Sequence, residues 1–80
     1  MQECEAMETL AKNIGILLQD RGWTQSELAA RTDIARPNIS RIISGKEQLS
    51  IARAERIAKA FNLSLAELLN ENLENLLAVA

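Results

Sequence analysis

The side chains best suited to chemistry lie between Arg36 and Ser44, where two arginines, Asn38 and Ser40 occur without an acid. Arginine donates hydrogen bonds to neighbouring acceptors, and serine both donates and accepts them. Catalysis has little support, because the absence of His and the single Cys exclude His-based triads, His-ligated metals and cysteine clusters. We therefore expect recognition through hydrogen bonds rather than an enzyme, with no cofactor and no metal site.

A helix would place these side chains on one face. Pro37 is tolerated in a first helical turn, so we expect the helix to begin near Arg36 and to end near Gly45. At 100° per residue, Ile39 and Ile42 define its buried side. The opposite side carries Pro37, Ser40, Arg41 and Ser44, flanked by Arg36 and Asn38. Such a face suits the major groove of DNA, where arginine binds guanine O6 and N7 bidentately; an ordinary solvated helix is the alternative for this segment alone.

Four more helices are indicated by apolar residues spaced three and four apart. Gly22 suits the left-handed position that follows a helix, and Asn62 can end another. Thr24 and Ser64 each precede a glutamate by three residues, which is the capping-box pattern, and Ser50 is a further cap. The expected helices run from Met7 to Arg21, Thr24 to Asp33, Ser50 to Asn62 and Ser64 to Leu77. With no alternating strand pattern, we predict a compact all-α bundle of five helices.

Length and composition fit one domain. The chain has 80 residues, 48% of them apolar, and its only aromatic residues are Trp23 and Phe61, so the core must be largely aliphatic. The acidic start contains no apolar run typical of a signal peptide, and no apolar run is long enough to span a bilayer. We therefore expect a soluble cytoplasmic protein without a membrane partner.

The charge is unevenly distributed along the chain. Residues 21–59 contain eight bases and four acids, whereas residues 1–20 contain one base and four acids, and residues 60–80 contain three acids and no base. A polyanion near the centre would respond to this local field more than to the net charge of -2. Taken alone, the basic centre fits solvated helix faces equally well, and we expect Arg53, Arg56 and Lys59 to be of that kind.

The second and third expected helices form a helix-turn-helix pattern. Ala29 supplies a small residue for a close helix crossing, Asp33 a turn residue and Ile34 an apolar residue that pins the turn. The run from Leu10 to Leu69 resembles the phage-repressor (Cro/cI, or XRE) family of helix-turn-helix DNA-binding domains. The matching segments are 23–29, 38–42, 44–46, 50–51 and 57–69. The resemblance implies a lambda-repressor-like fold and a sequence-specific transcriptional regulator of double-stranded DNA, most simply a repressor.

The same resemblance assigns roles to individual positions. It implies that the third helix enters the major groove and that the second helix lies with its N-terminus against the phosphate backbone. The implied base contacts are Arg36, Pro37, Ser40 and Arg41. The implied backbone contacts are Thr24, Gln25, Asn38, Ser44, Lys46, Gln48 and Ser50. The chain departs from the family pattern at Ala35, where a Ser or Thr cap is frequent, at Pro37, which offers only apolar contact, and at Ile43, which replaces a frequent Glu.

The C-terminal segment adds a prediction about assembly. The family domain, residues 10–69, is complete near Leu69, yet an apolar stripe continues through residues 70–80. Apolar surface left in water is unfavourable, at about 25 cal/mol per Å². We therefore expect a homodimer that binds a palindromic operator, with recognition helices about 34 Å apart. Its expected interface residues are Leu69, Leu73, Leu76 and Leu77. The alternative is that this segment folds back over the first helix of its own chain.

Two other classes of protein remain open. One is an antitoxin-like regulator that binds DNA and also a toxin protein, through the C-terminal segment or the end of the first helix. The other is an interaction module that keeps the fold but has lost DNA binding. Gln25 and the acid-free face of the third helix argue against the second class.

Overall fold

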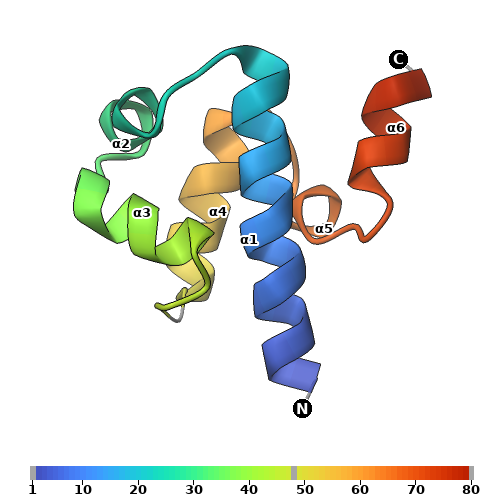
Figure 1. Ribbon diagram of the computed structural model, residues 1–80, viewed down its shortest axis with the longest axis horizontal. Helices are drawn as coiled ribbons and strands as arrows, with labels where there is room; N and C mark the ends of the chain where they lie inside the picture. The colour runs from blue at the N-terminus through green and yellow to red at the C-terminus, as the bar shows by residue number, and fades with distance from the viewer. Residues whose placement is uncertain (1, 48, 80) are drawn as a thin grey trace.

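The computed structural model describes residues 2–47 and 49–79, and it forms six helices. Their bounds are α1 Gln2–Arg21, α2 Gln25–Thr32, α3 Arg36–Ile43, α4 Ile51–Ala60, α5 Leu65–Leu68 and α6 Leu73–Val79. Helix α1 runs through the middle of the molecule, with α2, α3 and α4 on one side and α5 and α6 on the other (Figure 1). The described part contains no strand, which confirms the all-α prediction. Every helix in it is too short or too polar to cross a bilayer.

The predicted fifth helix is wrong in its length. It is interrupted after Leu68, and a turn separates α5 from α6. Asn13 of α1 explains the break, because its side chain is 1% exposed and donates to the carbonyl oxygens of Leu68 at 2.7 Å and Asn70 at 2.8 Å. These carbonyls lie at the end of α5, where helix geometry leaves acceptors without partners. A buried amide from another helix therefore fixes this helix end and the turn that follows.

Local caps set most of the other helix ends as predicted. The Oγ1 of Thr24 accepts from the Glu27 N–H at 3.1 Å, and the Oγ of Ser50 caps α4 in the same way. Ser64 and Glu67 form a complete capping box, with bonds of 3.1 and 2.8 Å. The left-handed region is occupied by Gly22 at φ 69° and Asn62 at φ 62°, each just after a helix.

The core is aliphatic around one phenylalanine. Its most buried members come from all parts of the chain: Ile14, Leu17, Leu28, Ile39, Ile42, Ile57, Phe61 and Leu68. Trp23 is half-buried and stacks on Phe61, with ring centroids 5.0 Å apart and the planes 16° from parallel. The guanidinium of Arg31 lies 4.0 Å from the Trp23 ring centroid, within cation–π range. Trp23 thus packs at the edge of the core, before the Thr24 cap.

Helix α6 packs against α1 of the same chain. Leu73 is 2% exposed and joins the core, so the expectation that it stays uncovered within one chain is corrected. The turn created by Asn13 redirects the chain and brings Leu73 inward. Leu77 is half-buried beside Ile16, whereas Leu69 is 38% and Leu76 51% exposed. The C-terminal stripe is therefore split between an inward and an outward side.

Candidate nucleic-acid interface

The α2–α3 turn fixes the orientation of α3. Asp33 adopts the left-handed conformation at φ 60° and reverses the chain directly after α2. Ile34 is 4% exposed and anchors the turn in the core. The buried Oγ1 of Thr32 donates to the carbonyl of Leu28 at 2.8 Å, which satisfies a hydroxyl that burial would otherwise penalise. Short α2 and α3 are consequently held as one rigid unit against α1 and α4.

Helix α3 presents one polar face to solvent. Ile39 and Ile42 are each 1% exposed and hold the opposite side in the core. The outward residues are Arg36, Pro37, Arg41 and Ser44, which are exposed, and Asn38 and Ser40, which are half-buried. No side chain caps the helix at Ala35, in keeping with the missing Ser or Thr. The face itself carries hydrogen-bonding groups and no acid, and four of these six side chains are exposed.

Helix α2 packs against α3, and its N-terminus carries two further expected contact residues. Thr24 is exposed and its hydroxyl caps the helix. Gln25, the first residue of α2, is half-buried, and its Oε1 is buried without a hydrogen-bond partner among the described residues. Such unpaired buried atoms are uncommon in folded proteins. Gln25 is therefore placed by the fold rather than free in solvent.

The loop from α3 to α4 carries the remaining expected backbone contacts. Gly45 has φ 75°, and the amide of Lys46 donates to the carbonyl of Arg41 at 2.9 Å, which turns the chain back beside α3. The Lys46 side chain is exposed. The Oγ of Ser50 accepts the bond that caps α4, and its hydroxyl hydrogen can still donate to another acceptor. Gln48, an expected backbone contact, lies outside the described residues.

Comparison with known proteins identifies the family. Residues 14–68, more than half of the chain, match the helix-turn-helix family model. The chain belongs to the XRE-type helix-turn-helix family. It is also similar to a competence pilus inhibition repressor of Acinetobacter baylyi, with 37% identity over 68 residues that cover 82% of this chain and 62% of that protein. The chain thus spans less than two thirds of that relative's length. No solved structure matches it.

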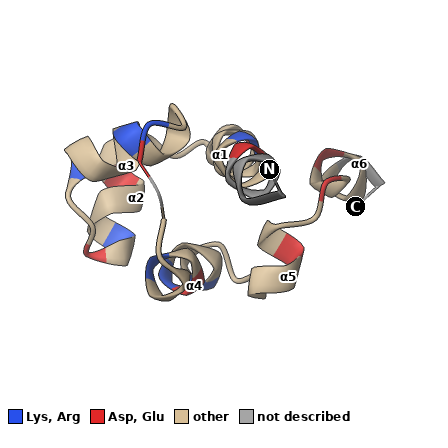
Figure 2. Cartoon of the chain, turned by 90° about the horizontal axis from the view of Figure 1, so that it is seen from below, with Lys and Arg blue, Asp and Glu red and all other residues tan. Residues whose placement is uncertain are grey.

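Family membership identifies the XRE-type domain as a DNA-binding regulatory domain, a class that is typically not enzymatic. Its charge distribution agrees with that class. Figure 2 shows Lys and Arg on α2, α3 and α4, whereas α5 and α6 carry only acidic residues among their charges. The acidic helices lie across α1 from α3 (Figure 1).

One member of the surface was missed by sequence reasoning. Glu47 in the α3–α4 loop lies 3.2 Å from Nε of Arg41 and 3.1 Å from Nη1 of Arg53. We expected Arg53 to be an ordinary solvated residue, but Glu47 connects it to Arg41 of α3. The sequence feature that could have indicated this role is that Glu47 is the only acid between Asp33 and Glu55.

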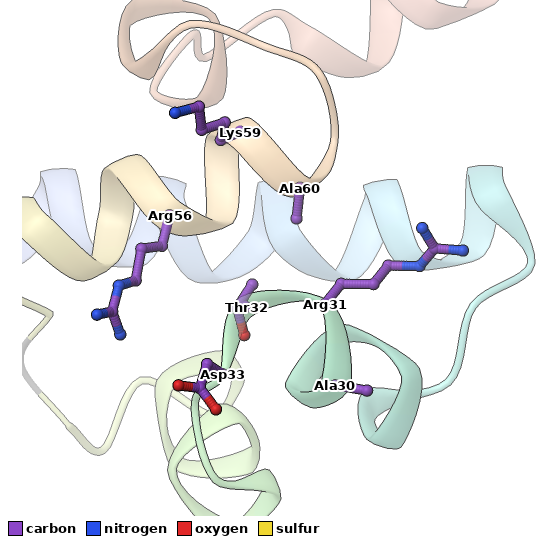
Figure 3. Close-up of a pocket in the computed structure, with 7 residues that line it drawn as sticks. All are labelled: Ala30, Arg31, Thr32, Asp33, Arg56, Lys59 and Ala60. Carbon is purple, nitrogen blue, oxygen red and sulfur yellow. The ribbon is translucent and has the colours of Figure 1, made fainter.

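A shallow cleft of about 360 Å³ lies between the end of α2 and the second half of α4. Its lining is Ala30, Arg31, Thr32, Asp33, Arg56, Lys59 and Ala60 (Figure 3). Arg31 extends away from Arg56 and Lys59 and is bonded to Glu27 at 2.9 Å. The charged groups therefore do not converge on one point, and the cleft has no arrangement suited to catalysis.

Proposed function

We propose that this domain is a transcriptional repressor that binds a specific double-stranded DNA operator as a homodimer. The observation that carries the proposal is the outward face of α3, which is acid-free and held rigidly by buried Ile39 and Ile42. The word repressor in the name of the Acinetobacter relative supports the direction of regulation. The proposed base contacts are Arg36, Pro37, Ser40 and Arg41.

Arginine and proline play different parts in the proposed base contacts. Arg36 and Arg41 are exposed and able to donate paired hydrogen bonds to guanine. Pro37 has no donor and contributes an apolar contact, for which a thymine methyl is the matching group. Ser40 lies between them on the helix face and can donate or accept. The operator is therefore expected to combine guanine positions with a thymine.

Backbone contacts surround the recognition helix. The proposed set is Thr24, Gln25, Asn38, Ser44, Lys46 and Ser50, with Gln48 as a further member on sequence grounds. With the Gln25 Oε1 buried, its amide NH₂ is the group left to donate to a phosphate oxygen. These contacts supply affinity and fix the register of the domain on the duplex, whereas the base contacts select the sequence.

The proposed dimer interface uses the outward side of the C-terminal stripe. Leu69 and Leu76 remain exposed, and Leu77 borders a shallow groove with Ile16. Leu73 lies beneath this surface and supports it from the core of its own chain. Pairing with a second copy would remove the exposed leucines from water. Two recognition helices about 34 Å apart would then match successive major grooves.

Selection of bound sequences from random duplex DNA tests the proposal. We expect enrichment of a palindromic or near-palindromic motif, and binding of the selected duplex by a dimer in light scattering. A gel shift with the selected and a scrambled duplex measures the preference. Recovery of no motif would refute sequence-specific binding, and a monomer at micromolar concentration would refute the dimer.

A further inference from the structure

Glu47 is an acid beside a surface that is proposed to bind phosphate. Both oxygens of its carboxylate are engaged: Oε1 lies 3.2 Å from Nε of Arg41, and Oε2 lies 3.1 Å from Nη1 of Arg53. The Glu47 side chain is only 23% exposed. An acid in this place weakens attraction to DNA, so its contribution must come from what it does to the two arginines.

The two ion pairs differ in strength. The Arg41 side chain is 62% exposed, whereas that of Arg53 is 39% exposed and forms a part-buried hydrogen bond with Glu47. Exposure to water and salt weakens an ion pair. The bond to Arg53 is therefore the firmer of the two. It fixes the carboxylate near the start of α4, where Oε1 lies 3.2 Å from Nε of the mainly exposed Arg41.

The atom of Arg41 that Glu47 binds is decisive. Glu47 pairs with Nε, on the inner edge of the guanidinium, and leaves the terminal Nη1 and Nη2 outside this pair. Bidentate recognition of guanine needs two parallel N–H donors for O6 and N7. The two Nη groups can provide them while Nε stays on Glu47. The ion pair and the base contact are therefore compatible and can exist together.

We propose that Glu47 is a specificity-determining residue that positions Arg41 for a base and reduces its attraction to phosphate. This inference rests on the proposed DNA-binding function. On the cognate operator, the Nη groups of Arg41 meet guanine in an orientation that is already set. On other DNA, Arg41 can gain only phosphate contacts, and the nearby carboxylate opposes them. Glu47 therefore widens the difference in affinity between operator and random DNA.

Glu47→Gln tests this inference, because it removes the charge with little change of shape. The matched control is Glu55→Gln, an exposed residue of α4 outside the network, which changes the net charge equally. Fluorescence anisotropy with the selected operator and with a random duplex gives the affinity ratio. We expect Glu47→Gln to lower the ratio of operator affinity to random-DNA affinity about tenfold. This fall lies within the range expected for losing a base-contacting arginine. We expect less than a twofold change for Glu55→Gln.

The salt dependence separates the two actions of Glu47. With the carboxylate neutralised, one more cationic charge per chain can act on phosphate, so the slope of log affinity against log salt on random DNA should steepen by about 0.9 per chain. Glu47→Asp keeps the charge but shortens the side chain, so it should lower the ratio while leaving this slope unchanged. Thermal unfolding followed by circular dichroism checks that the variants remain folded.

The Glu47→Gln substitution is then repeated in a protein that also carries Arg41→Ala. Without Arg41, Glu47→Gln should no longer alter the preference for the base pair that Arg41 contacts. An unchanged ratio in Glu47→Gln, an equal fall in Glu55→Gln, or the same fall without Arg41 would each overturn the inference while leaving the DNA-binding function intact. A wild-type protein that prefers no sequence would instead overturn the proposed function, and the inference with it.

Discussion

Replacing Asn13 by Ala should destabilise the domain more than any surface change, because Asn13 connects α1 to the α5–α6 turn. Its amide is 1% exposed and donates to two carbonyl oxygens, at 2.7 and 2.8 Å. Leaving a buried acceptor without a partner costs about 1–3 kcal/mol; the bond to Leu68 is buried and the bond to Asn70 part-buried, so we expect a loss of about 3 kcal/mol. Domains of this kind have a total stability of about 5–15 kcal/mol, so the loss is a large fraction.

Asn13→Asp sharpens the test. The carboxylate has the shape of the amide, but it has no N–H and would face two carbonyl oxygens, so we expect a larger loss than for Ala. Asn75→Ala is the matched control, because Asn75 lies exposed on α6. Exposed substitutions of this kind are usually within about 0.5 kcal/mol of wild type.

Urea unfolding followed by circular dichroism and by Trp23 fluorescence measures these free energies. Trp23 stacks on Phe61 in the core, so its emission reports on tertiary packing rather than on helix content alone. Asn13→Ala should lower the urea midpoint clearly, and both signals should change together if the domain unfolds in two states. A midpoint within error of that of Asn75→Ala would refute the reasoning, since the two hydrogen bonds would then contribute nothing.

Three further predictions concern DNA binding and assembly. Arg41→Ala should cost about 1–3 kcal/mol of binding free energy on the selected operator and relax the preference at one base pair. Lys46→Ala should instead weaken binding to all sequences similarly, and fluorescence anisotropy can measure both effects. Equal losses on operator and random DNA would make Arg41 a phosphate contact. If a dimer neutralises eight phosphates, log affinity should fall with log salt with a slope of about -7, and a slope near zero would contradict the electrostatic contribution. Serine at both Leu69 and Leu76 should shift the protein toward monomer in light scattering, whereas serine at Ile51, which is 71% exposed on α4, should not.

Sequence reasoning predicted the features that depend on near neighbours. The Thr24, Ser50 and Ser64 caps act within three residues, and the left-handed residues Gly22 and Asn62 follow from backbone sterics. The exposed face of α3 follows in the same way, because two buried isoleucines and the helical period fix which side chains point outward.

Features that depend on distant residues could not be predicted. The break between α5 and α6 is made by Asn13, which is 57 residues from Asn70 along the chain. Nothing in the leucine spacing of residues 65–77 signals that partner, and the pattern alone favours a continuous helix. The engagement of Glu47 is similar, because it requires the loop after Gly45 to bring one carboxylate between a residue of α3 and a residue of α4.

The separation of charge explains how an acidic chain can present a DNA-binding surface. The net charge is -2 and the pI about 5.1, which by themselves suggest repulsion from DNA. Electrostatic interactions are screened over about 8 Å at physiological salt, whereas the domain extends 32 Å along its longest axis. The acids of α5 and α6 lie across α1 from α3, so they scarcely weaken the field at the α3 face (Figure 2). Glu47 is different because it touches Arg41 directly, and this proximity is why one loop acid should influence DNA binding more than the whole acidic C-terminal segment.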